Sequence, residues 1–119
     1  MKLQEDLYCY KVKDVIKVVD GDTIDLMLDL GFSTYVKKRI RLNAINAYES
    51  RTRNKKEKKK GLAAKARLIE LCDGSDIILK SCGVGKYGRI LGELYIQGAN
   101  INNILLSEGH ALPYNDRKT

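Results

Sequence analysis

Alternating apolar and polar positions dominate the first third of the chain and predict β-strands. Residues 8–19 are rich in Val, Ile and Tyr, and residues 23–30 read T-I-D-L-M-L-D-L after an Asp-Gly turn. The two segments are predicted to form a hairpin, and residues 34–42 add a third strand. Apolar and basic side chains are expected on opposite faces of that strand: Val36, Ile40 and Leu42 against Lys37, Arg39 and Arg41.

The rest of the chain mixes helical and strand-like periods. A helix is predicted over residues 58–72, where apolar positions recur at helical spacing: Leu62, Ala66, Ile69 and Cys72. Two short strands, 76–81 and 90–96, follow, and residues 100–108 form a closing helix that ends at a glycine. Five strands with a helix between the third and fourth indicate a closed Greek-key barrel of the oligonucleotide-binding type. The expected fold class is therefore mainly β with two to three helices (α+β).

Chain length and composition narrow the protein class further. A chain of 119 residues forms one domain. No apolar run approaches the ~20 residues of a membrane span, and the first residues, M-K-L-Q-E-D, lead into no signal-like stretch. We expect a cytoplasmic protein that does not bind membranes. The three cysteines include no C-x-x-C pair, so we expect reduced, buried thiols and neither zinc nor disulfides.

The positive charge of the chain is concentrated in one segment. Net charge is +7, and residues 51–60, R-T-R-N-K-K-E-K-K-K, hold seven cations and one acid. A run of this kind forms either a plain solvated loop or a surface that attracts a polyanion over long range. Within this predicted basic loop (residues 50–60), the candidate nucleic-acid contacts are Arg51, Arg53, Lys55 and Lys56.

A single histidine limits the chemistry that the chain can perform. His110 excludes mechanisms that need two imidazoles, and we expect it to pack or cap at the end of the last helix. Nucleophilic serine or cysteine triads are also unsupported, because no G-x-S-x-G occurs and nothing pairs a thiol with His110.

Three short polar stretches supply what phosphodiester hydrolysis needs. They are D-G-D-T at residues 20–23, R-L-N-A-I-N-A-Y-E at residues 41–49 and K-Y-G-R at residues 86–89. Two guanidiniums, Arg41 and Arg89, match the oxygens of a phosphate that gains negative charge, and Glu49 can act on water. Asp20 and Asp22 can share or support a hard cation.

Each of these residues also has an ordinary structural explanation. The D-G-D-T stretch can be a simple hairpin turn, the arginines can be surface residues of strands, and Glu49 can be a plain loop acid. Their joint order along the chain favours the hydrolase.

Longer stretches around these residues resemble the staphylococcal nuclease (thermonuclease) family. They are V-V-D-G-D-T-I-D-L-M, R-L-N-A-I-N-A-Y-E, G-K-Y-G-R-I-L-G-E-L-Y-I and N-I-L-L-S-E-G-H-A-L-P-Y, in the family's order from about residue 12 to residue 115. The resemblance implies a five-stranded barrel with helices. It also implies a calcium-dependent nuclease that cuts DNA and RNA, breaks the bond to the 5′-oxygen and leaves a 3′-phosphate. Because the first residues resemble no export signal, the resemblance favours an intracellular member of bacterial or phage origin.

The resemblance implies a role for each matching residue. Arg41 and Arg89 would stabilise the transition state, and Glu49 would activate water. Asp22 and the backbone carbonyl of Ala47 would bind calcium, with Asp20 in support. The remaining matches would bind nucleic acid: Lys86 and Tyr87 at a terminal phosphate, and Tyr114 near a base.

Two positions depart from the family pattern. Asn46 replaces a calcium-binding aspartate, and Tyr48 replaces the usual proline before the catalytic glutamate. Asparagine still offers a carbonyl oxygen, so we expect weaker calcium binding or a changed metal preference.

The main alternative to the enzyme is a non-catalytic module of the same fold that binds nucleic acid or a protein. A weaker one is an architectural or inhibitory protein that uses only the basic loop. Retention of Arg41, Glu49 and Arg89 together favours the enzyme, which we expect to be a monomer that prefers single-stranded nucleic acid.

Overall fold

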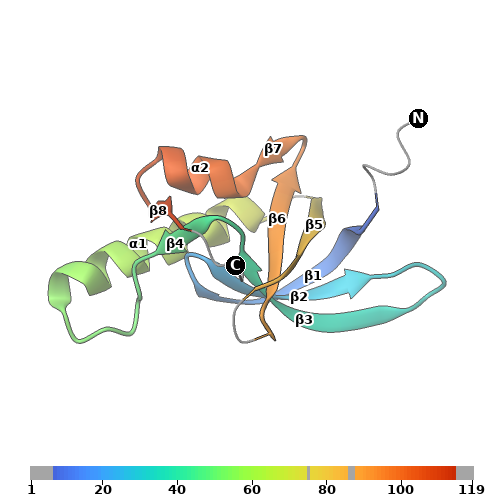
Figure 1. Cartoon of the computed structure of the whole chain (residues 1–119), viewed down its shortest axis with the longest axis horizontal. Helices are drawn as coiled ribbons and strands as arrows, with labels where there is room; N and C mark the ends of the chain where they lie inside the picture. Colours follow the sequence, from blue (N-terminus) through green and yellow to red (C-terminus); the bar gives the residue numbers. More distant parts are fainter. Residues whose placement is uncertain (1–6, 75, 86–87, 115–119) are drawn as a thin grey trace.

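The computed structural model describes residues 7–74, 76–85 and 88–114 and is built on a closed β-barrel (Figure 1). The barrel strands are β1 (Cys9–Asp20), β2 (Thr23–Asp29), β3 (Tyr35–Leu42), β5 (Ile77–Val84) and β6 (Ile90–Ile96). They are hydrogen-bonded in the order β3-β2-β1-β5-β6, and a parallel pairing of β3 with β6 closes the ring. The predicted fold class and the predicted five-stranded barrel are confirmed.

Strand β1 bends strongly, and this bend allows the barrel to close. Its register against β2 shifts at three places along its 12 residues. Such bulges bend a strand and increase its twist. β1 consequently pairs with β2 through residues 11–20 and with β5 through residues 9–11.

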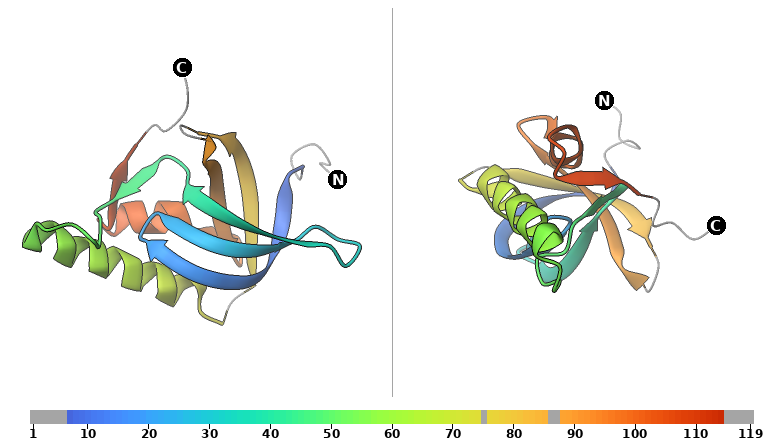
Figure 2. Two further views of the ribbon diagram at one scale, coloured as in Figure 1. Left: turned by 90° about the horizontal axis from the view of Figure 1, so that it is seen from below. Right: turned by 90° about the vertical axis from the view of Figure 1, so that its left-hand side faces the viewer.

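Three short strands were not predicted from the sequence. β4 (Ile45–Ala47) and β8 (Ala111–Pro113) pair as a small antiparallel sheet, visible beside the barrel in Figure 2. β7 (Ala99–Asn100) extends the main sheet next to β6. Strands of two or three residues are too short for an alternating pattern to be recognised.

The first helix begins earlier than predicted and includes most of the basic segment. Helix α1 spans Lys55–Cys72, so residues 55–60 are helical and not part of a loop. The side chain of Asn54 caps the helix by accepting hydrogen bonds from the backbone amides of Lys56 and Glu57. Since lysine is also a good helix former, this cap allows the helix to start within the run of charges.

The buried face of α1 also differs from the prediction. Leu62 and Ile69 are 47% and 49% exposed, and Ala66 is exposed as well. Cys72 is buried as expected, and the other buried residues of the helix are Gly61, Ala64 and Leu68. Small side chains let the helix approach the β1–β2 turn and the segment after β4, and hydrophobicity alone does not signal such close packing.

Helix α2 (Ile101–Ser107) closes the fold close to its predicted position. Ile101 and Leu105 face the core, as expected. A bidentate ion pair of Arg67 with Glu108, at 2.7 and 3.0 Å, links α1 to the end of α2. The half-buried His110 follows, and its Nε2 lies 3.7 Å from Glu108, so it occupies the expected place at the helix end.

The cysteines are free, as predicted, but only one is buried. Cys72 lies in the core, where burial raises the pKa of its thiol to about 11. Cys9 is exposed and Cys82 is half-buried, which corrects the expectation of three buried thiols. Among the described residues, no helix is long and apolar enough to cross a membrane.

Candidate active site

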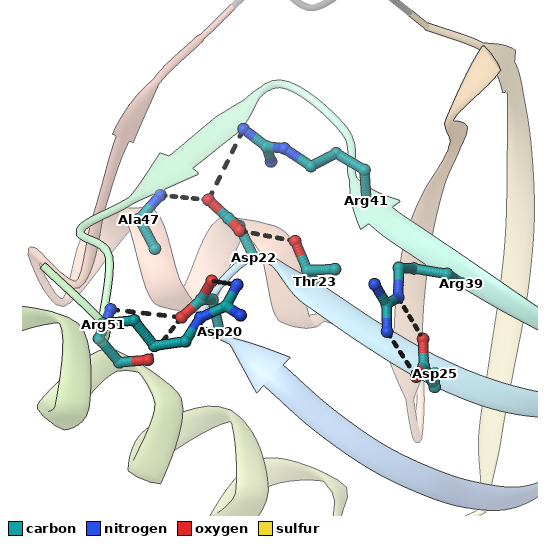
Figure 3. Close-up of polar contacts among 9 residues, drawn as sticks. Asp20, Asp22, Thr23, Asp25, Arg39, Arg41, Ala47 and Arg51 are labelled. Atoms are coloured by element: carbon teal, nitrogen blue, oxygen red, sulfur yellow. Dashed lines mark hydrogen bonds and ion pairs between the residues drawn. The ribbon is translucent and has the colours of Figure 1, made fainter. Parts of the chain in front are cut away.

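A cleft of about 350 Å³ gathers most of the residues that the sequence singled out. It lies where the β1–β2 turn, β3, β4 and the start of β6 meet (Figure 3). The predicted residues that line it are Asp20, Asp22, Arg41, Asn46, Ala47, Glu49, Arg51, Arg89 and Tyr114. Segments far apart in the sequence therefore bring carboxylates and guanidiniums to one concave surface.

Asp22 is held in the centre of the cleft by neighbours on three sides. One carboxylate oxygen accepts a hydrogen bond from the Ala47 amide at 2.7 Å, and the other accepts one from the Thr23 hydroxyl at 2.9 Å. A guanidinium nitrogen of Arg41 lies 3.6 Å away. Because Asp22 is only 7% exposed, these contacts fix its orientation and compensate for the loss of water around the charge.

Arg41 is buried and anchored by carbonyl oxygens. It is 5% exposed, and it donates hydrogen bonds to the Leu42 and Ile45 carbonyls at 3.1 and 2.7 Å. It also donates to the amide oxygen of Asn46 at 3.0 Å. The ring of Tyr114 lies 5.5 Å from the guanidinium carbon, within the range of a cation–π contact. The guanidinium is therefore positioned before any ligand binds.

The segment after β4, which carries Glu49, is fixed by contacts with α1 and with the β1–β2 turn. Asp20 accepts hydrogen bonds from the hydroxyl and the backbone amide of Ser50, at 2.6 and 3.3 Å. The ammonium of Lys60 lies 4.9 Å from the ring centre of Tyr48. Gly61 packs so closely on the Glu49–Ser50 peptide that a side chain there would collide with the backbone. The loop is thus fixed while Glu49 stays exposed.

Arg89 reaches the cleft through the closure of the barrel. It directly precedes Ile90, which pairs with Ile40 in the parallel β3–β6 ladder. Its own position therefore falls beside Arg39, two residues before Arg41. The strand pairing that closes the barrel brings the two predicted phosphate-binding arginines together.

Some predicted residues do not join the cleft. Arg53, Lys55 and Lys56 are exposed just before and at the start of α1 and do not line it. Lys86 and Tyr87 lie outside the described residues. The nucleic-acid contacts expected of these five residues stay predictions.

The cleft also contains polar residues that the sequence did not mark as functional. They are Thr23 and Arg39 on its walls, with Ser50 and Asp25 directly behind. Arg39 forms a two-pronged ion pair with Asp25, and this guanidinium holds the pKa of that carboxyl below its usual value. The only signal for Arg39 in the sequence is its spacing of two residues from Arg41 on the same face of a strand.

Oxygen donors in the cleft are of the type that suits a hard cation. Asp22, the Asn46 amide and the Ala47 backbone lie together, and calcium accepts carboxylate, amide and carbonyl oxygens as well as water. However, in the described part of the chain no three His, Cys, Asp or Glu side chains form a metal-binding group. The amide oxygen of Asn46 also accepts a hydrogen bond from Arg41. The residues fit calcium with few anionic ligands, which predicts modest affinity.

A second cavity, of about 410 Å³, lies between β1 and the C-terminal end of α1. Its walls carry three carboxylates, Asp14, Asp73 and Asp76, and one cation, Lys13. This surplus of negative charge repels a phosphate, whereas the smaller cleft is lined by four arginines and three acids. The smaller cleft is therefore the better candidate for phosphate chemistry.

The chain is similar to known proteins over most of its length. A family model described as staphylococcal nuclease homologue matches residues 39–119. The chain is 32% identical over 110 residues to a micrococcal nuclease of Shigella flexneri, covering 85% of this chain and 57% of that protein. It is 31% identical over 106 residues to an uncharacterized endonuclease of Escherichia coli, covering 88% and 62% respectively. The chain thus spans about three fifths of the length of these relatives.

Proposed function

The chain belongs to the family of staphylococcal nuclease homologues, and from this premise we propose that it is a calcium-dependent nuclease that hydrolyses DNA and RNA. One observation carries the proposal. Asp22, Arg41, Glu49 and Arg89, which come from four separate segments, line a single cleft. A protein that only binds nucleic acid has no need of a carboxylate such as Glu49 beside the phosphate site, because it would repel the ligand.

In the proposed reaction, water attacks the phosphorus and the bond to the 5′-oxygen breaks. Glu49 accepts a proton from the attacking water, and the leaving 5′-oxygen takes up a proton to become a hydroxyl. The products are a 3′-phosphate and a 5′-hydroxyl. Glu49 suits this role because it is exposed in the cleft on a loop that its neighbours hold still.

The two arginines stabilise the negative charge that grows on the phosphate oxygens. Arg41 supports this role because its guanidinium is fixed before the substrate arrives, so little reorganisation is needed in the transition state. Arg89 is exposed in the same cleft and reaches the phosphate from the residue just before β6, the strand that pairs with β3.

Calcium would be held by Asp22, the Asn46 amide oxygen and the Ala47 carbonyl, with Asp20 in support. When bound, the ion polarises the phosphate and helps to neutralise its charge. In this proposal Asp20 also has a second role in the protein alone, because its carboxylate holds Ser50, the residue after Glu49, in the segment that follows β4.

A cleavage assay with matched variants tests the proposal. The protein is incubated with single-stranded DNA or RNA in calcium, in magnesium and in a chelator, beside Glu49→Gln and Glu70→Gln. Both variants remove one exposed carboxylate, but Glu70 lies on α1 outside the cleft. Loss of the general base is expected to reduce cleavage by roughly 10²–10⁴-fold, while Glu70→Gln retains full activity.

The same assay distinguishes the alternative, a module of this fold that binds nucleic acid without cutting it. That alternative is favoured by Asn46, whose oxygen is used by Arg41 and whose amide brings no charge to a cation. Equal binding by the native chain and Glu49→Gln, with no products in any metal, would establish the binder. For the enzyme we expect faster cleavage of single strands, because a small cleft reaches a splayed phosphate more easily than one in a duplex.

A further inference from the structure

We propose that Arg39, held by Asp25, forms a second phosphate-binding position next to the scissile one and follows the nucleic-acid backbone along β3. The inference rests on the proposed function only in placing nucleic acid in the cleft. Arg39 lines the cleft with Arg41 and Arg89, yet its side chain is 63% exposed and its charge faces solvent. This is unlike Arg41, which is only 5% exposed.

The spacing along β3 suits two neighbouring phosphates. Arg39 and Arg41 are two residues apart on one strand, so both side chains lie on the same face, about 6.8 Å apart along the strand. A separation of this order matches that of consecutive phosphates in an extended single strand. A strand whose scissile phosphate lies against Arg41 would therefore bring an adjacent phosphate over Arg39.

The ion pair with Asp25 orients Arg39 without using up its donors. Nε and one terminal nitrogen donate to the two carboxylate oxygens, at 2.8 and 3.1 Å. A guanidinium has five N–H groups, so three are left over for another acceptor. Figure 3 shows the pair standing on β2 and β3 next to Thr23 and Asp22. Because Asp25 is only 6% exposed, its carboxylate has a fixed position and orients the arginine.

Neighbouring cations increase the attraction for an anion at this point. Lys17 on β1 is paired with Asp25 in the sheet register and is exposed, so Asp25 lies between Lys17 and Arg39. Arg89 falls beside Arg39 at the β3–β6 junction. The buried carboxylate of Asp25 thus lies between cations of the two strands beside β2.

Binding in the absence of cleavage tests the proposal. Affinity for a labelled single-stranded oligothymidylate is measured in chelator over a range of salt concentrations for the native chain, Arg39→Gln and Arg67→Gln. Arg67 is the matched control, because it forms the same bidentate pair with a carboxylate but joins the two helices away from the cleft. For single strands, each phosphate contact adds about 0.7 to the slope of log affinity against log salt.

The expected result is a slope reduced by about 0.7, with affinity lowered roughly tenfold, in Arg39→Gln only. The double variant Asp25→Asn, Arg39→Gln should behave in the same way, since it removes the buried carboxylate that the single variant leaves unpaired. Identical slopes in Arg39→Gln and the native chain would overturn the proposal.

Neutral linkages in the oligonucleotide locate the contact. A methylphosphonate beside the cleavage point, on one side or the other, should weaken binding of the native chain and of Arg67→Gln. Arg39→Gln should bind the modified and unmodified strands equally. If the penalty persists in Arg39→Gln, Arg39 contacts no phosphate.

The binding result and the proposed function can fail separately. One outcome is that Arg39→Gln removes the binding penalty of the methylphosphonate but no metal-dependent cleavage is found. This would support the phosphate position in a protein that only binds nucleic acid. Cleavage without such coupling would support the enzyme and leave Arg39 as a structural residue of the sheet.

Discussion

Replacing Gly61 by alanine tests whether helix α1 holds the segment after β4, which carries Glu49, in position. A Cβ at residue 61 would lie 2.7 Å from the Ser50 nitrogen and 2.5 Å from the Glu49 carbonyl carbon. Ordinary contacts begin at about 3.4 Å, so the loop must retreat by about 0.9 Å, the difference between 3.4 and 2.5 Å. Both colliding groups are backbone, so no side-chain rotation can relieve the contact.

The variant should lose far more activity than stability. Alanine is favoured over glycine within a helix by about 0.8–1.0 kcal/mol, which offsets part of the ~1–3 kcal/mol that overpacking costs. A displacement of about 1 Å at a reacting group costs roughly 100-fold in rate. We therefore expect kcat of Gly61→Ala to fall about 100-fold while Tm falls by only a few degrees.

The measurement is kcat on single-stranded DNA at saturating substrate, well below Tm, together with thermal unfolding. Ala66→Gly is the control, because it is exposed on the same helix and costs about 1 kcal/mol without touching the loop. That control should retain native kcat. A Gly61→Ala protein with unchanged kcat and a raised Tm would show that the helix does not position Glu49.

Two further predictions concern the cation and the acid stability of the fold. Asn46→Asp should raise calcium affinity at least about tenfold, because it adds a charge to the donor set, although Arg41 will compete for the new carboxylate. Calorimetric titration of both proteins checks this, and equal affinities would contradict it. The hydrogen bond from Arg67 lowers the pKa of Glu108 below its usual value of about 4.5, so the pair stabilises the fold fully above that pH and the benefit fades as pH falls further. Glu108→Gln should therefore unfold at a lower temperature than the native chain at pH 7, with the difference closing below about pH 4.5. A difference that stays constant down to pH 2 would show that the ion pair does not contribute.

The sequence was sufficient for the barrel because its long strands carry strong alternating patterns. β2, β3 and β6 were predicted to within one residue at each end. β4 and β8 were missed because each has only three residues and their pairing depends on tertiary contacts, such as the hydrogen bond from the Ala47 amide to Asp22. The local sequence pattern contains no information on contacts between residues that lie so far apart in the chain.

The face of α1 was predicted wrongly for a related reason. Its most hydrophobic residues, Leu62 and Ile69, are half exposed, while Gly61 and Ala64 make the closest approaches to the barrel. A Cβ on Gly21 would lie 2.6 Å from the Ala64 Cβ, so the packing relies on two residues that both lack bulk. Small side chains allow two backbones to approach closely, and a search for regularly spaced hydrophobic residues does not detect them.

Motif order located the cleft residues, but it did not predict their environment. Arg41 was expected on the basic face of β3, yet carbonyl oxygens and Tyr114 bury it. Asp20 was expected only to support a cation, and it is also the acceptor that holds Ser50. Roles of this kind depend on which backbone groups the fold leaves nearby.

Closure of the barrel by β3 and β6 has a consequence for the newly made chain. For a nuclease of the kind proposed, the Arg89 wall of the cleft exists only after β6 has emerged from the ribosome and paired with β3. Until then, a nascent chain has Asp22, Arg41 and Glu49, but Arg89 is not yet in place to hold a phosphate. If the chain has the proposed activity, it would be synthesised beside messenger and ribosomal RNA with its site still incomplete, and the order of the strands would delay cleavage until most of the barrel has been translated.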